Sequence, residues 1–133
     1  MKASGKGIRV LIVDDDIVNL ELLQAVLDGE GFDVSAVSDA SSALKIALAE
    51  QPHIILMDVQ LPEMDGLEAT RMLKADERTA QIPVVAVTAH VRPDDQERCK
   101  EVGCVLHVSK PIDTRKLPDL IYAVLSSRTE AHS

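Results

Sequence analysis

Several residue types are scarce in this chain of 133 residues, and each shortage narrows the classes of protein it can belong to. Aromatic residues make up 2% of the chain, with no Trp, so the core must be aliphatic and a platform for stacking single-stranded nucleic acid is disfavoured. Cys99 and Cys104 are too few for a disulfide scaffold, and we expect reduced thiols in a cytoplasmic protein. No apolar run exceeds six residues and the N-terminus does not resemble a signal peptide, so no membrane association is predicted.

Positive charge is also scarce. The chain has 14 Lys and Arg residues against 22 Asp and Glu residues, a formal net charge of −8, which argues against nucleic-acid binding. Hydrophobic residues make up 46% of the sequence, enough for a packed core.

The length is that of one domain, which we place at residues 8–126, with short polar tails at 1–7 and 127–133. We expect a monomer or a weak dimer, and the alternatives of a complete chain, which the start at Met1 and the ragged tail favour, and of a fragment of a longer protein both stay open.

Five short, mainly apolar segments have the composition of β-strands, and segments with helical periodicity separate them. We expect the second helix to have Ser38 or Asp39 as its N-cap. The fifth helix begins near Asp113 or near Leu117, because Pro118 distorts its first turn. The five predicted strands are residues 9–13, 32–37, 53–57, 83–87 and 104–108.

The strict alternation of strands and helices predicts an α/β fold with a parallel sheet and right-handed crossovers. The first, third and fourth strands are nearly continuous apolar runs, as expected of strands covered on both faces. The second alternates with polar residues, and His107 interrupts the fifth, so these two suit the sheet edges. We therefore predict a five-stranded, doubly wound, flavodoxin-like sheet with strand order 2-1-3-4-5.

Polar residues follow four of the five predicted strands. In such sheets, ligands bind outside the carboxyl ends of the strands, where the strand order reverses. Taken singly, each of these residues has an ordinary explanation as a helix cap, a turn or a surface group. Taken together, converging carboxylates repel one another unless a cation lies between them, and oxygen ligands without His or Cys favour Mg²⁺. A lysine and a hydroxyl beside the metal complete a site suited to phosphoryl transfer. The residues are Asp14, Asp15, Asp16, Asp58, Thr88 and Lys110.

Four motifs together resemble the receiver domain of bacterial two-component response regulators, the CheY-like family. They are LIVDDD, LMDVQLPEMDG, VVAVTA and VSKP, and the resemblance covers residues 8–126. It implies that Asp58 accepts a phosphoryl group from a phosphohistidine. It also implies that Asp15 is the principal Mg²⁺ ligand, that Asp14 assists, often through water, and that the backbone carbonyl of Gln60 completes the protein's share of the metal shell.

The same resemblance assigns roles to the later motifs. Thr88 would hydrogen-bond the phosphoryl oxygens, Lys110 would pair with the phosphoryl charge, and the Lys110–Pro111 bond would be cis. His107 stands where the family usually has Tyr or Phe that moves on activation, which puts the usual aromatic switch in doubt. His90 and Gln60 occupy positions that tune phosphate lifetime in the family.

The resemblance further implies the partners and the mode of action. The phosphodonor would be a sensor histidine kinase or a histidine phosphotransfer protein. The phosphorylated domain would bind a downstream protein through the face formed by the fourth helix, fifth strand and fifth helix. It would act as a switch that assists only its own phosphorylation and dephosphorylation.

Two other classes share features with this chain. Asp14-Asp15-Asp16-Ile17-Val18 fits the D-x-D-x-[TV] motif of haloacid-dehalogenase-like phosphatases, in which Asp14 would be the nucleophile of a hydrolase. That alternative lacks a later acidic pair after a fourth strand and leaves LMDVQLPEMDG unexplained. A flavodoxin needs a Ser/Thr-rich phosphate loop after the first strand and aromatic residues around the flavin, and this chain has acidic residues and almost no aromatics.

Overall fold

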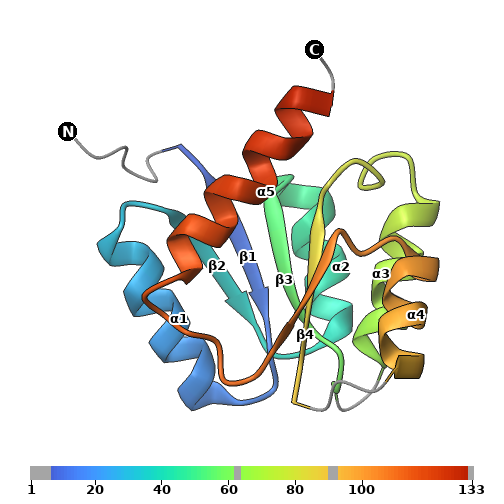
Figure 1. The fold of residues 1–133 in the computed structure, drawn as a ribbon, viewed down its shortest axis with the longest axis horizontal. Coiled ribbons are helices and arrows are strands. Elements are labelled where there is room, and N and C mark those ends of the chain that lie inside the picture. The colour runs from blue at the N-terminus through green and yellow to red at the C-terminus, as the bar shows by residue number, and fades with distance from the viewer. Residues whose placement is uncertain (1–6, 62–63, 90–92, 132–133) are drawn as a thin grey trace.

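The computed structural model describes residues 7–61, 64–89 and 93–131, and within them strands and helices alternate along the chain (Figure 1). The strands begin within two residues of their predicted positions. The elements are β1 (Arg9–Val13), α1 (Ile17–Gly29), β2 (Asp33–Val37), α2 (Ala40–Glu50), β3 (Ile54–Asp58), α3 (Gly66–Ala75), β4 (Val84–Thr88), α4 (Pro93–Val102), β5 (Leu106–Ser109) and α5 (Leu117–Ala131).

The five strands form one parallel sheet in the order β2-β1-β3-β4-β5, which confirms the predicted topology. Helices α1 and α5 cover one face, and α2, α3 and α4 cover the other (Figure 1). Every residue of β3 and β4 is buried, whereas β2 has no fully buried residue and β5 is partly exposed. The continuous apolar runs therefore mark the inner strands, and the interrupted ones mark the edges.

The core is aliphatic, as the shortage of aromatic residues requires. The α1–α5 side is built mainly from Leu, Ile and Val of both helices and of the inner strands. On this side, Phe32 contributes a buried ring whose centroid lies 5.4 Å from that of Tyr122. The opposite side packs the small residues Ala40, Ala43 and Ala47 of α2 against the sheet, so this helix lies close to it.

Helix ends follow local hydrogen-bonding rules. The side chain of Asp39 caps α2 by accepting from the backbone N–H of Ser42 at 2.7 Å, which settles the choice between Ser38 and Asp39. Helix α5 begins at Leu117, the later of the two predicted starts. Asp113 belongs to a separate turn before it, in which Lys116 N–H donates to Asp113 O. This helix continues to residue 131, past residue 126, where we expected a polar tail to begin.

The region before β5 differs from the prediction. Alternation along the predicted strand 104–108 puts Cys104, Leu106 and Val108 on one face and Val105 and His107 on the other. Leu106, Val108 and His107 follow it, because their register partners on β4 are Val85, Val87 and Ala86 respectively. The extension of this alternation to residues 104 and 105 is wrong. Cys104 packs against the clusters beneath α3 and α4, and Val105 lies with Leu106 in a groove along α5. The regular strand starts only at Leu106, so alternation does not apply before it.

Among the described helices, none combines the length and the apolar composition needed to cross a bilayer.

Neighbouring leucines on α1 provide a test of the packing. Leu23 is 2% exposed, and Leu22 is 51% exposed. Replacing Leu23 with Ala leaves a cavity and should lower the free energy of unfolding by about 2–5 kcal/mol. Replacing Leu22 with Ala should change it by less than about 1 kcal/mol. Urea denaturation of the two variants measures both values. Equal losses would contradict the orientation of α1.

Candidate functional site

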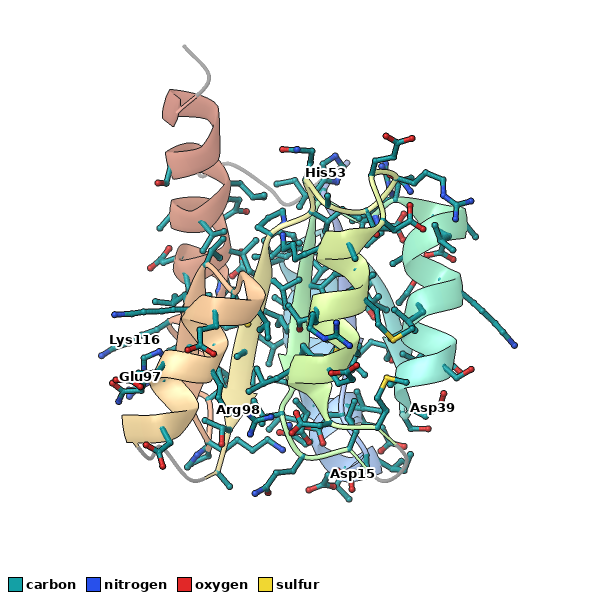
Figure 2. All side chains as sticks on the ribbon, turned by 90° about the vertical axis from the view of Figure 1, so that its right-hand side faces the viewer. Asp15, Asp39, His53, Glu97, Arg98 and Lys116 are labelled. Atoms are coloured by element: carbon teal, nitrogen blue, oxygen red, sulfur yellow. The ribbon has the colours of Figure 1, made fainter. Side chains whose placement is uncertain are left out.

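The carboxyl ends of β1, β3, β4 and β5 bring the predicted site residues to one edge of the sheet. Asp14 directly follows β1, Asp58 and Thr88 are the last residues of β3 and β4, and Lys110 directly follows β5. Figure 2 shows Asp15 at this end of the molecule, while His53, which precedes β3, lies at the opposite end. The predicted convergence at the reversal of strand order, between β1 and β3, is thus present in the structure.

Asp14 is 2% exposed, and donors surround its carboxylate. Its Oδ1 accepts from the backbone N–H of Asp16 at 2.9 Å. Its Oδ2 accepts from Nδ2 of Asn19 at 2.6 Å and lies 3.1 Å from Nζ of Lys110. Burial acts to raise the pKa of Asp14, but these hydrogen bonds and the lysine charge outweigh it and hold the pKa below its usual value. Asp14 therefore remains a carboxylate.

Asp58 is 3% exposed and has fewer donors. Its Oδ1 accepts from the backbone N–H of Gln60 at 3.0 Å, and its Oδ2 accepts from Nζ of Lys110 at 3.1 Å. Burial is the largest influence and raises the pKa of Asp58 to about 6, helped by the charge of Asp14 and opposed by the two donors. The two buried carboxylates thus have pKa values displaced in opposite directions.

Lys110 joins the two carboxylates. Its ammonium lies 3.1 Å from both Asp14 and Asp58, and its backbone N–H donates to Thr88 O at 2.8 Å, which anchors the end of β5 to β4. Burial acts to lower the pKa of Lys110, but both carboxylates outweigh it and raise the pKa above its usual value. The lysine is therefore charged. The bond from Lys110 to Pro111 is cis, as the family resemblance implied.

Three carboxylates in the site could hold a metal ion. One oxygen each from Asp14, Asp15 and Asp58 lies within 4.8 Å of the other two. Asp15 is exposed, so a cation bound here would be reached from solvent. Asp16 is used differently, because its Oδ1 caps α1 by accepting from the N–H groups of Val18 and Asn19 at 3.0 and 3.3 Å. A donor set of carboxylate oxygens without His or Cys fits Mg²⁺.

Two neighbours of the acidic residues were not predicted from the sequence. Asn19, which donates a hydrogen bond to Asp14, lies in the first turn of α1. The only sign of it in the sequence is that it interrupts the apolar residues of this helix. The second neighbour, Gly66, is the first residue of α3. A Cβ on this residue would lie 1.9 Å from the carbonyl oxygen of Asp58, so no other residue fits without moving the backbone of Asp58. Gly66 N–H also donates to Val59 O at 2.8 Å, which fixes α3 against the end of β3.

The remaining predicted residues surround this centre. Thr88 is 3% exposed at the end of β4. Gln60 is exposed, and its N–H is committed to Asp58, while the role of its carbonyl as a metal ligand stays a prediction. His107 is half-buried on the face of β5 that α4 covers. His90 lies outside the described residues.

Residues 10–122 match the family described as the response regulator receiver domain, and the chain belongs to this family. It is a receiver domain of two-component signal transduction, a class of phosphoacceptor proteins that generally act as signalling switches. The match accounts for all four motifs from which the resemblance was inferred, and it does not favour the haloacid-dehalogenase alternative.

The polar-differentiation response regulator DivK of Brucella ovis is 39% identical over 116 residues, which cover 87% of this chain and 94% of DivK. A CheY-like receiver domain protein from Methanospirillum hungatei has a TM-score of 0.86 at 27% identity, covering 93% of this chain and 98% of that one. The receiver domain of a sensor histidine kinase from Pseudomonas aeruginosa has a TM-score of 0.83 at 32% identity, covering 90% and 98%. The latter structure has a magnesium ion coordinated in its active-site cleft.

The raised pKa of Asp58 predicts how stability depends on pH when divalent ions are removed by a chelator. A carboxyl group whose pKa is higher in the folded than in the unfolded protein stabilises the fold below its unfolded pKa, and this contribution is lost as pH rises through the folded value. Here the window runs from 3.8 to about 6. Asp58→Asn should therefore be more stable than wild type near pH 7.5, by about 3 kcal/mol.

The stabilisation should shrink as pH falls and disappear below about pH 4, where Asp58 is protonated in both states. Urea denaturation of both proteins across this pH range measures the difference, and titrating groups that do not interact with Asp58 cancel in the comparison. A constant difference at every pH would show that Asp58 does not have a raised pKa.

Proposed function

We propose that Asp58 is the phosphoacceptor of this receiver domain. The observation that carries the proposal is the arrangement of Asp58, Asp14 and Lys110, in which one ammonium contacts both buried carboxylates at the point where strand order reverses. The Gln60 N–H holds Oδ1 of Asp58, and Lys110 holds Oδ2, so the carboxylate has a fixed orientation. Fixed orientation is the main requirement for in-line attack on a phosphoryl group.

In the proposed reaction, an oxygen of the Asp58 carboxylate forms a bond to the phosphorus of a phosphohistidine. The P–N bond breaks, and the leaving imidazole nitrogen keeps the electron pair. The product is an acyl phosphate on Asp58 and a free histidine on the donor. Lys110 neutralises charge on the transferred group, and Thr88 donates its hydroxyl to a phosphoryl oxygen. No general base is needed, because the nucleophile is already a carboxylate.

The proposal includes Mg²⁺ as a cofactor. Asp14, Asp15, Asp58 and the backbone carbonyl of Gln60 would hold it, with Asp15 as the principal ligand. The ion would neutralise negative charge on the phosphoryl oxygens. Asp14 is suited to a ligand role, since its pKa is held low and it stays ionised.

The partners and the output also belong to the proposal. The donor is a sensor histidine kinase or a histidine phosphotransfer protein, and the output is the binding of a downstream protein to the α4–β5–α5 face. Thr88 and Lys110 link the site to this face, since Thr88 is the last residue of β4 and Lys110 directly follows β5. His107 is the switch residue proposed on β5. Cys99 and Cys104 form no disulfide, which is consistent with the cytoplasmic location proposed.

Mapping of the modified residue tests the acceptor. Incubation with phosphoramidate and Mg²⁺ should label the protein, and borohydride reduction followed by digestion should locate the label at residue 58. Asp58→Asn should abolish labelling, because an amide is a poor nucleophile, and chelation of Mg²⁺ should do the same in the wild type. A label at Asp14 would instead support the phosphatase alternative and refute this assignment.

Two neighbouring carboxylates test the metal site. Asp15→Asn should weaken Mg²⁺ binding by about tenfold or more, since even outer partners of metal ligands contribute that much. Asp16→Asn should change it far less, because Asp16 caps α1 and Asn is an equally good cap. Calorimetric titration with MgCl₂ measures both. Similar losses in the two variants would indicate a diffuse acidic field instead of a defined site.

A further inference from the structure

Asn19 places a neutral hydrogen-bond donor beside the acidic site. The residue lies in the first turn of α1 and is half-buried, and its Nδ2 donates to Oδ2 of Asp14 at 2.6 Å. A carboxylate can only accept hydrogen bonds, so the amide nitrogen, and not the amide oxygen, has to face Asp14. The function proposed above assigns phosphoryl acceptance, metal binding and charge neutralisation to other residues and gives this contact no role.

The turn in which β1 passes into α1 holds this amide in place (Figure 1). The backbone N–H of Asp16 donates to Oδ1 of Asp14 at 2.9 Å, and Oδ1 of Asp16 accepts from the backbone N–H of Asn19 at 3.3 Å. The Asn19 side chain then returns to Asp14, which closes a ring of three residues. The backbone N–H of Asp14 donates to Val37 O at 3.1 Å and ties the ring to β2. The contact between Asn19 and Asp14 is therefore fixed by its own corner of the fold.

Lys110 reaches the same oxygen from the other side of the site. Its Nζ lies 3.1 Å from Oδ2 of Asp14, so this oxygen has two donors, and it also lies 3.1 Å from Oδ2 of Asp58. The lysine follows β5, whereas Asn19 belongs to α1, so the two donors can separate without disturbing each other's backbone. Asp14 is 2% exposed, and bulk water cannot readily replace a donor that leaves it.

We propose that Asn19 is a positioning residue that keeps Asp14 partnered while Lys110 passes from Asp14 to the phosphoryl group on Asp58. This proposal rests on the function proposed above and concerns a residue that contacts none of the reacting atoms. Once Asp58 is phosphorylated, the charge that Lys110 neutralises lies on the phosphoryl oxygens, beyond the carboxylate, and the ammonium loosens its contact with Asp14 to follow that charge. Removing one partner of a buried ion pair is strongly unfavourable. Asn19 reduces this cost because its amide stays on Oδ2.

Beryllofluoride, BeF₃⁻, tests the proposal, because it mimics a phosphoryl group on a carboxylate and binds reversibly. Asn19→Leu removes the donor at nearly constant volume. At saturating MgCl₂ it should weaken BeF₃⁻ binding by about threefold or more, since a hydrogen bond to a buried charge contributes most where that charge has fewest partners. Gln24→Leu removes another half-buried amide from α1, five residues further along the helix, and should bind as wild type does. Titration of the full chain followed by backbone amide NMR measures each affinity.

The same substitution in a Lys110→Met background shows whether Asn19 acts through the lysine. Without an ammonium to release, Asp14 has the same partners before and after BeF₃⁻ binds, so Asn19→Leu should change the affinity by less than about twofold. The urea midpoint, measured with a chelator and no BeF₃⁻, should respond in the opposite way. Asn19→Leu should lower it more in the Lys110→Met background than in wild type, because the amide has then become the remaining side-chain donor to Oδ2 among the described residues. A purely structural role would lower it equally in both backgrounds.

The outcomes distinguish the two proposals. Failure of phosphoramidate to label Asp58 in the wild type refutes the proposed function. Normal labelling, together with equal BeF₃⁻ affinities in the Asn19→Leu and Gln24→Leu variants, refutes the role of Asn19 alone. Equal weakening of BeF₃⁻ binding by Asn19→Leu with and without Lys110, or equal loss of the urea midpoint in the two backgrounds, also refutes it, because Asn19 would then act independently of the lysine.

Discussion

The site depends on two buried carboxylates that share one ammonium group. Asp14 and Asp58 are 2% and 3% exposed, and Nζ of Lys110 lies 3.1 Å from each. Two carboxylates and one lysine leave an excess negative charge in a poorly hydrated place, which a folded protein retains only where the surrounding structure holds the groups together. A divalent cation is the natural complement of that excess. The excess of two carboxylates over one lysine therefore makes the site acidic. The same excess would attract a cation, beside which an anionic group could then bind.

The topology of the sheet holds these groups together. Strands β1 and β3 are neighbours although a strand and two helices separate them in sequence, so Asp14 and Asp58 emerge side by side. The position of Asp58 is fixed further by α3, because Gly66 lies against its carbonyl and leaves no room for a Cβ. Arg98 of α4 binds the N-cap of α3, Asp65, at 3.0 Å. Contacts thus run from the end of β3 through the start of α3 to α4.

Most of the fold and the membership of the site could be predicted from the sequence, because both follow from patterns local to each strand. Unbroken apolar runs distinguished the inner strands from the edge strands. The polar residues at the carboxyl ends of the strands identified the edge of the sheet at which the site residues meet. Contacts made by individual residues after the strands end could not be predicted in this way. The hydrogen bond of Asn19 to Asp14 and the approach of Gly66 to Asp58 join segments whose spacing carries no signal. Alternation also failed at Cys104, since it holds only within a regular strand.

Environment, not residue type, distinguishes the two buried aspartates and the roles proposed for them. Asp14 receives donors from Asp16, Asn19 and Lys110, which keep its pKa low, so it stays charged and favours a cation. Asp58 has two donors and a pKa raised by burial, so its charged form is held less tightly. The carboxylate that is less stabilised by its neighbours is the better nucleophile of the two, since it loses less hydrogen-bond and ion-pair stabilisation when it forms a new bond. The same comparison argues against Asp14 as the acceptor, because attack on phosphorus would require it to give up a more complete set of hydrogen bonds.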